Sequence, residues 1–174
     1  QALAKGGRDE QAVETATEVG AELVLPWQAE RCVSVWQGAK QAKGRQRWQA
    51  TALQAAKQAR RTRVPEVEEV RDTRALIDWV RRTEQSGGVV LVLHEEARTP
   101  ISTAMETVRL PAPGAAPPVL AVVVGPEGGI SPEETAALEA AGAMTVRLGP
   151  HVMRTASAGP VALAVLAHAS GLWE

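Results

Sequence analysis

The sequence contains no phenylalanine, no tyrosine and one cysteine among its 174 residues, and its only aromatic side chains are five tryptophans. Its core must therefore be built mainly from Val, Leu, Ala and Ile, and its hydrophobic content of 45% is ordinary for a globular protein. The lone Cys32 excludes an internal disulfide and a thiolate metal cluster, which suits a reducing compartment such as the cytoplasm. No group of His, Cys, Asp and Glu has metal-site spacing, so we expect no metal.

Long apolar runs are also absent. The longest covers residues 159–172, is interrupted by His168 and Ser170, and is too short to span a bilayer comfortably. No signal peptide is present either, so we expect no membrane association.

Positive charge is unevenly distributed. The net charge of −1 does not indicate a nucleic-acid-binding protein, but residues 40–63 contain eight Lys or Arg and no acid. Such a stripe is typical of phosphate contact and equally of a solvated helix face, and charge alone does not separate the two.

Apolar periodicity predicts alternating strands and helices. Strands are expected at 22–26, 31–35, 64–70, 89–93, 119–124 and 144–148. Helices are expected at 9–19, 44–61, 72–83, 99–107, 132–141 and 159–172. A Pro- and Ala-rich connector covers 111–118. This alternation favours one α/β domain with a mostly parallel, doubly wound sheet.

The most informative stretch joins the strand at 119–124 to the helix that follows it. Gly125-Pro-Glu-Gly-Gly129 comes directly after the strand, and Ser131, Pro132 and Glu134 form a capping box with proline at the first helical position. Ligands of α/β sheets bind at the carboxyl ends of strands. The loop matches neither the dinucleotide fingerprint nor the P-loop, and Pro126 removes an amide donor. We therefore expect a ligand held by backbone groups and shape rather than a triphosphate.

Two further strand ends carry polar or glycine-rich loops, at 93–95 and 148–151, and three adjacent strand ends would form one cleft. His94 is better explained as a strand-end histidine with a local hydrogen bond than as a general base. Arg154 is either a structural ion-pair partner or a positioned contact for an anion or a base, and composition does not choose between these. No nucleophile–base pair is present, because Ser131 reads as a cap and Cys32 as a small buried residue.

Five motifs together resemble the SPOUT superfamily of S-adenosylmethionine-dependent RNA methyltransferases. They are most similar to the RsmE type, which methylates N3 of a uridine in the 16S rRNA of the small ribosomal subunit. Each motif is weak alone, but their order is that of the family and they cover nearly the whole chain. The motifs are Glu30-Arg-Cys32, Arg61-Thr-Arg-Val-Pro-Glu66, Leu93-His-Glu-Glu-Ala97, Val124-Gly-Pro-Glu-Gly-Gly129 and Leu148-Gly-Pro-His-Val-Met-Arg-Thr155.

The resemblance implies an α/β fold of the SPOUT type, with a parallel central sheet and a C-terminal trefoil knot. Residues 1–174 would be the catalytic domain, and an N-terminal PUA-like RNA-binding domain would be absent from this fragment, which begins with Gln. The C-terminal helix would thread the knot and help to build a homodimer. The expected partner is 16S rRNA in the small subunit, and the expected location is the cytoplasm.

The resemblance also implies roles for individual residues. Arg154 would stabilise the deprotonated uridine or bind a neighbouring phosphate, with His94 and Glu127 as candidates for the base. RNA would contact Arg31, Arg60, Arg61 and Arg63. S-adenosyl-L-methionine would be held by Leu93, His94, Glu95, Val124, Gly125, Pro126, Glu127, Gly128, Gly129, Leu148, Gly149, Pro150, Val152, Met153 and Thr155.

The sequence departs from the family pattern at two places. Ala156 stands where a glutamate is common, so no acid–base role can be assigned there. Lys57 likewise replaces an acid, which makes the end of the helix at 44–61 more basic. Three other interpretations stay open: methylation of another rRNA or tRNA position, an RNA-binding module without catalysis, and a nucleotide-binding α/β protein of unrelated chemistry.

Overall fold

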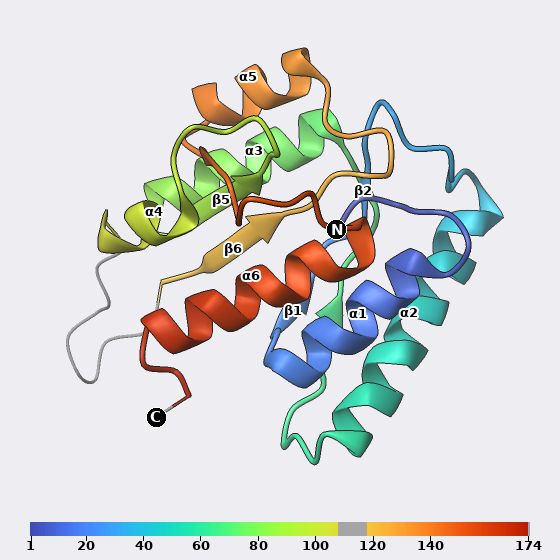
Figure 1. The fold of residues 1–174 in the computed structure, drawn as a ribbon. Helices are drawn as coiled ribbons and strands as arrows, with labels where there is room; N and C mark the ends of the chain where they lie inside the picture. Colours follow the sequence, from blue (N-terminus) through green and yellow to red (C-terminus); the bar gives the residue numbers. More distant parts are fainter. Residues whose placement is uncertain (108–117, 174) are drawn as a thin grey trace.

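The computed structural model describes residues 1–107 and 118–173, which form a layered α/β fold (Figure 1). The helices are α1 (Arg8–Val19), α2 (Ala39–Gln58), α3 (Thr73–Gln85), α4 (Ile101–Thr107), α5 (Pro132–Ala140) and α6 (Thr155–Ala169). The strands are β1 (Leu23–Val24), β2 (Trp27–Gln28), β3 (Glu66–Val67), β4 (Arg71–Asp72), β5 (Val89–Leu93), β6 (Leu120–Val123) and β7 (Met144–Val146).

Every strand pair among the described residues is parallel. Three sheets form, in the orders β1-β3, β2-β4 and β6-β5-β7. The first residues of the chain connect two of them, because Ala2 N–H donates to Val124 O and Leu3 N–H donates to Trp27 O, each at 2.9 Å. The parallel α/β architecture is therefore confirmed, although the one expected sheet is divided into short ladders.

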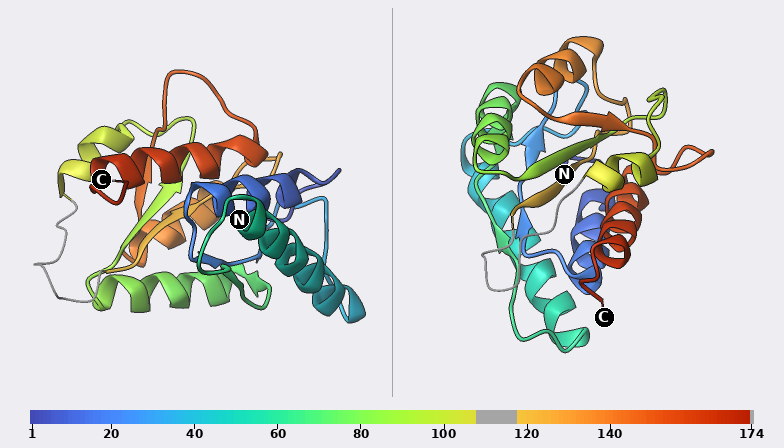
Figure 2. Two further views of the ribbon diagram at one scale, coloured as in Figure 1. Left: turned by 90° about the horizontal axis from the view of Figure 1, so that it is seen from below. Right: turned by 90° about the vertical axis from the view of Figure 1, so that its left-hand side faces the viewer.

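Helices cover both faces of this layer. Figure 2 shows α3 and α5 on one side and α1 and α6 on the other. Strand alternation explains the arrangement, since Val90 and Val92 face the core beneath α3 and α5 whereas Leu91 packs in the core beneath α4 and α6. A third core, which includes Trp36 and Trp48 at 5.1 Å between ring centroids, joins α1 and α2 to β1 and β3.

The capping box after β6 is confirmed. Ser131 Oγ accepts from Glu134 N–H at 3.2 Å, and the Glu134 carboxylate accepts from Ser131 N–H at 3.3 Å. The same buried carboxylate accepts from Glu30 N–H at 2.9 Å and from the Thr73 hydroxyl at 2.6 Å. Glu134 therefore fixes α5 to the start of α3 and to the loop after β2.

One predicted strand is wrong. Residues 31–35 are irregular. The chain turns at 29–32, where Cys32 N–H donates to Ala29 O at 3.1 Å, and Val33 and Val35 stay exposed instead of joining a core. The strand lies earlier, at β2, because the indole of Trp27 is fully buried there and fixes the register.

Three predicted helix starts are also corrected. α1 begins at Arg8 rather than at an Asp9 cap, because the buried Asp9 carboxylate accepts from Ala4 N–H and Glu10 N–H. α2 begins at Ala39, and Gly44 lies inside it, where a Cβ would come within 2.4 Å of the Trp36 ring. α6 begins at Thr155, four residues before the predicted 159.

The predicted connector at 111–118 lies outside the described residues except for Pro118.

Candidate active site

The carboxyl ends of β5, β6 and β7 open into one cleft of about 760 Å³. It is lined by the three loops that follow these strands, so the cleft predicted from the strand ends is present. Every residue predicted to hold a ligand in these loops lines it: Leu93, His94, Glu95, Val124, Gly125, Pro126, Glu127, Gly128, Gly129, Leu148, Gly149, Pro150, Val152, Met153 and Thr155.

The glycine loop after β6 is held at its first residue. A Cβ on Gly125 would lie 2.7 Å from Ile130 Cγ1, so no side chain fits there. Thr155 Oγ1 donates to Gly125 O at 2.8 Å and accepts from Gln1 Nε2 at 2.9 Å. At its other end, Gly129 has φ +73°, a left-handed conformation that glycine adopts without strain, and its N–H donates to Pro126 O at 2.9 Å.

Glu127 lies at the edge of the cleft and is held from the start of the chain. Its carboxylate accepts from Lys5 N–H and from the Arg8 guanidinium, each at 3.1 Å. Partial burial favours the neutral form, but the backbone N–H groups of Glu127 and Lys5 and the Arg8 cation outweigh it and lower the pKa of Glu127. A carboxylate stabilised in this way is a weak base, which argues against Glu127 as the proton acceptor.

His94 has the local contact expected of a strand-end histidine. The backbone N–H of His94 donates to Val146 O at 3.0 Å, and the ring Nδ1 accepts from the backbone N–H of Glu96 at 3.2 Å. The half-buried ring lines the cleft, and its Nε2 has no hydrogen bond within the described chain. The local hydrogen bond predicted for His94 is therefore present, and it engages Nδ1 rather than Nε2.

The loop after β7 presents unpaired donors to the cleft. Within the part of the chain that the structure describes, the backbone N–H groups of Gly149, His151, Val152 and Met153 donate to no protein acceptor. Arg154 follows as the residue that caps α6, with an exposed side chain that lines the cleft and has no acidic partner within 4 Å among the described residues. This placement favours a positioned contact for an anion over a structural ion pair.

The arginines predicted to bind RNA are not brought together. Arg31 lines the cleft and donates to Gly128 O at 3.3 Å. Arg60, Arg61 and Arg63 follow α2 and do not line it. Arg61 is engaged within the fold, where it donates to Thr17 O at 2.9 Å, to Ala21 O at 2.5 Å and to Glu22 Oε1 at 2.7 Å. These contacts give Arg61 a structural role that the basic stripe did not indicate.

Some residues of the cleft were missed from the sequence. Arg8 reaches it from α1, and Arg147 enters from the end of β7. No local motif marks either residue, since Arg8 depends on a contact with Glu127, 119 positions away. The remaining additions are Glu96, Ile130, Pro132, His151 and Ala158.

Among the described residues, every helix is too short or too polar to span a bilayer. Over the same residues, no three His, Cys, Asp or Glu side chains are grouped so as to hold a metal ion.

The sequence matches a family described as RNA methyltransferase domain over residues 1–167. The chain belongs to this RNA methyltransferase family. The match confirms the resemblance inferred from the five motifs.

Curated relatives of the family have the same name in distant bacteria. The chain is 48% identical to "Ribosomal RNA small subunit methyltransferase E" of Mycobacterium bovis over all of its length, which covers 63% of that protein. It is 31% identical to the protein of that name from Bacillus subtilis over 98% of its length and 64% of that protein. The chain thus spans less than two thirds of the curated relatives it matches.

Solved structures of methyltransferases share the fold. The ribosomal RNA small subunit methyltransferase E from Neisseria gonorrhoeae, bound to S-adenosyl methionine, superposes with a TM-score of 0.81 at 25% identity, over 97% of this chain and 63% of that one. The SpoU methyltransferase AviRb from Streptomyces viridochromogenes, at 15% identity and a TM-score of 0.56 over 96% of this chain and 57% of that one, shows a likeness of fold alone.

Proposed function

We propose that this chain is the catalytic domain of an enzyme that uses S-adenosyl-L-methionine to methylate N3 of a specific uridine in 16S rRNA. The observation that carries the proposal is the cleft at the ends of β5, β6 and β7, with its unpaired amides and the free Arg154. The names and bound ligand of the similar proteins support the same reaction and substrate.

The residues present fit S-adenosyl-L-methionine. The unpaired amides of the 148–154 loop suit the acceptor atoms of an adenosine, and Leu93, Val124 and Leu148 supply apolar surface for its ring. Glu95 and Glu96 provide negative charge at the edge for its cationic groups. Backbone groups of residues 125–129 and 148–153 would hold the adenine and ribose.

The chemistry makes two demands on the protein. When bound, S-adenosyl-L-methionine supplies an electrophilic methyl group, which the accepting nitrogen must meet in line, so positioning is the first demand. The second demand is that uridine N3 loses its proton. The Arg154 guanidinium, placed beside the uridine oxygens, would stabilise the anion that forms. His94 Nε2 is the better candidate for the proton acceptor, because the backbone N–H groups of Glu127 and Lys5 and the Arg8 cation lower the pKa of Glu127 and so make it a weak base.

Access to the cleft requires the target uridine to leave any base stack, as in other enzymes that modify bases. Arg31 lies beside Gly128 in the cleft, and we assign it to a phosphate next to the target. Arg60 and Arg63 would contact the RNA elsewhere.

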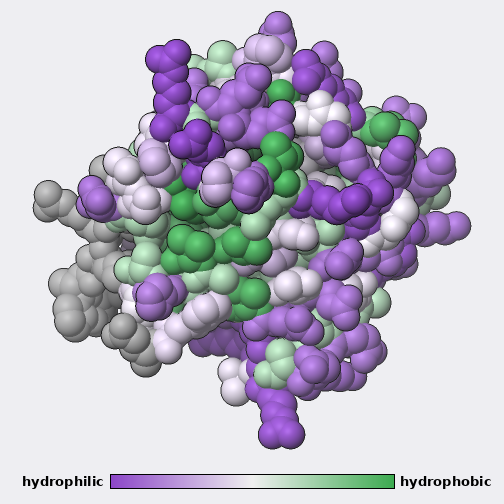
Figure 3. Space-filling view, in the orientation of Figure 1, coloured by the Kyte–Doolittle hydropathy of each residue, from purple (hydrophilic) through white to green (hydrophobic). Residues whose placement is uncertain are grey.

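We further propose that the three loops of the cleft form a C-terminal trefoil knot threaded by α6. α6 also exposes apolar residues. Val161 and Val165, four residues apart on one face of the helix, are each 36% exposed. Val152, in the loop that precedes α6, is 75% exposed. Figure 3 shows apolar surface gathered on the face where α6 lies in Figure 1. A second copy of this chain covering that surface would give the expected homodimer.

The curated relatives are longer than this chain, and we assign the PUA-like RNA-binding domain to the part of their length that this chain does not cover. We therefore propose that the 1–174 domain binds the cofactor alone and methylates RNA slowly without that domain. Its substrate, the small ribosomal subunit, would place the enzyme in the cytoplasm.

Two measurements test this function. Calorimetry with S-adenosyl-L-methionine should give micromolar binding, and mass mapping of nucleosides from 16S rRNA should find N3-methyluridine only after treatment with the enzyme and cofactor. A methyl group on a ribose or on tRNA would show that the substrate is another RNA position. An absence of cofactor binding would favour the alternative of an RNA-binding module without catalysis.

A further inference from the structure

The end of α2 has a strained backbone at Arg60. This residue has φ +55°, and it is the only non-glycine with positive φ among the described residues. Arg61 N–H donates to Ala56 O at 2.9 Å across it, which is how a left-handed residue closes a helix. Glycine is the usual residue here, because a Cβ makes this conformation unfavourable.

The Arg60 side chain has no contact that would offset this strain. It is exposed and has neither a hydrogen bond nor an ion pair within the described chain. Lys57 and Arg63, on either side of it, are likewise exposed and unpaired there. We call Lys57, Arg60 and Arg63 the basic tip.

Other cations of the same stripe form ion pairs with acidic side chains of the protein. Arg45 pairs with Glu69 at 3.3 Å, Arg47 with Glu10 at 2.7 Å and Arg61 with Glu22 at 2.7 Å. The stripe from residue 40 to residue 63 therefore contains two kinds of cation. Its paired arginines hold α2 and its C-terminal end to neighbouring elements. The basic tip, like Lys40 and Lys43 near the start of α2, has no ion pair within the described chain.

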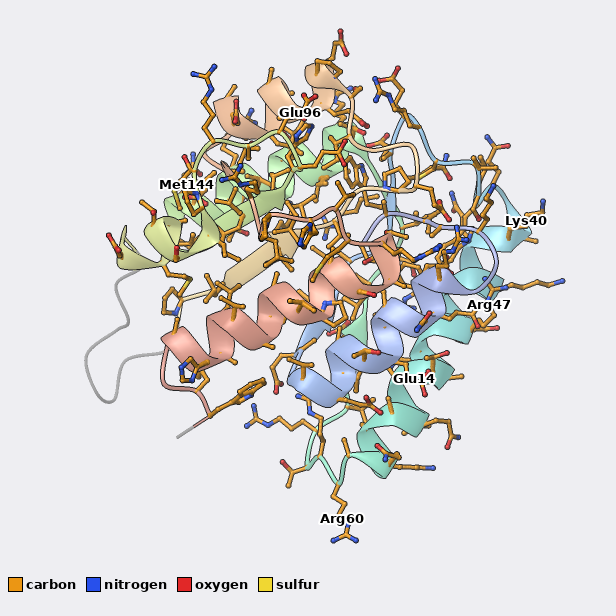
Figure 4. The ribbon with its side chains drawn as sticks, viewed as in Figure 1. Glu14, Lys40, Arg47, Arg60, Glu96 and Met144 are labelled. Carbon is orange, nitrogen blue, oxygen red and sulfur yellow. The ribbon has the colours of Figure 1, made fainter. Side chains whose placement is uncertain are left out.

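The basic tip is remote from the cleft. In Figure 4 Arg60 points away from the body of the molecule at one end of α2, with Lys40 at the other end of the helix and Glu96, which lines the cleft, on the opposite side of the molecule. α2 alone is about 30 Å long, since its 20 residues rise ~1.5 Å each. A small ligand cannot reach from the cleft to this tip, but a folded RNA can.

We propose that the basic tip is a second RNA contact, which binds backbone phosphates of the substrate away from the target uridine. This inference rests on the proposed function. An arginine held in a glycine-like conformation is explained if the cation itself is needed there. Three exposed cations without interleaved aromatic or acidic side chains suit sequence-independent phosphate contact.

The test separates charge from strain by comparing three variants of the chain. Arg60→Gln removes the charge and keeps the strain, and Arg60→Gly removes both. Arg81→Gln makes the same charge change on α3, where Arg81 is 52% exposed and pairs with Asp78 at 3.0 Å. Each is titrated with a fluorescent RNA hairpin of 16S sequence at several salt concentrations between 50 and 200 mM, with thermal unfolding and cofactor binding measured in parallel.

We expect both Arg60 variants to bind the hairpin about fivefold to tenfold more weakly than the parent and to lower the slope of log K against log salt by about 1. Cofactor affinity should stay unchanged. Only Arg60→Gly should raise Tm, by about 2–4 °C, because the strain is released. Arg81→Gln should keep the parental RNA affinity and slope.

The inference is overturned if the Arg60 variants bind RNA as Arg81→Gln does while the parent still methylates the uridine. In that case the proposed function stands. A parent chain that binds the cofactor but has no affinity for RNA overturns both.

Discussion

Thr155 and Gly125 are joined by a hydrogen bond of 2.8 Å from the threonine hydroxyl to the glycine carbonyl oxygen. The bond connects the first residue of α6 to the loop after β6, so two walls of the cleft are fixed relative to each other. The relative position of two loops of the cleft thus depends on a threonine hydroxyl that is engaged within the protein.

Thr155→Val tests that dependence. Losing the hydroxyl leaves the carbonyl of the half-buried Gly125 without this donor, and we expect the free energy of unfolding to fall by about 1–2 kcal/mol. Calorimetry should also show weaker binding of S-adenosyl-L-methionine, because the loops are less well fixed. Thr155→Ser keeps the hydroxyl and should retain most of the affinity, so equal losses in both variants would contradict the role of the hydrogen bond.

Gly125→Ala tests the packing of the glycine loop. The added Cβ would lie 2.7 Å from Ile130 Cγ1, and we expect it to destabilise the fold by about 1–3 kcal/mol in denaturant unfolding. Gly149→Ala is the matched control, because a Cβ there meets nothing within 4 Å. If both variants lose the same stability, the contact with Ile130 is not the cause.

Arg154→Ala should abolish methyl transfer and leave cofactor affinity nearly intact. Removing a charge that stabilises a developing anion typically lowers kcat by about 10²–10³-fold. Single-turnover kinetics and calorimetry on the same sample separate the two effects. Arg154→Lys keeps the charge without the planar fork, so we expect partial activity. An unfolded or cofactor-free Arg154→Ala protein would instead indicate a structural role.

Glu127 should make the stability depend on pH in acid. Its folded pKa is lowered, so the stabilisation is fully present above the ordinary glutamate value of about 4.3 and is lost as pH falls through the folded pKa. The pair with Arg8 is partly exposed, with side chains 36% and 22% accessible, so the effect should be under about 1 kcal/mol. Denaturant unfolding between pH 3 and 6 should show a shallower pH dependence in Glu127→Gln. Arg8→Gln should raise the pKa of Glu127 in a carboxyl NMR titration, and an unchanged value would rule out Arg8 as a cause.

Local sequence signals predicted the elements that depend on local chemistry. The capping box at Ser131 and Glu134 was predicted correctly. The helix predicted from residue 72 is also present, and it begins after Asp72, whose carboxylate accepts from Ala75 N–H at 2.8 Å. The strand-end loops were also located, because glycine-rich turns after apolar runs have a distinct pattern. These loops supply most of the cleft.

Features that depend on distant partners were not predictable. The sequence predicts a helix that starts at Gly44, but α2 starts five residues earlier and continues through this glycine. The Trp36 ring packs against Gly44 so closely that a Cβ would not fit. Arg61 appeared in a basic run, yet its partners are carbonyls of Thr17 and Ala21 in another part of the chain. In each case a contact with a residue distant in sequence decides the local structure or the role of the side chain. The periodicity of apolar residues does not indicate such contacts.

Residues 1–5 hold two loops of the cleft in place, and this constrains how the domain folds. Gln1 reaches Thr155 across 154 positions, and Lys5 N–H reaches Glu127 across 122. Contacts of such long range close large loops, and they form slowly compared with helices. During translation the cleft cannot assemble until α6 has left the ribosome, so a ligand can bind there only after nearly all of these 174 residues have been synthesised.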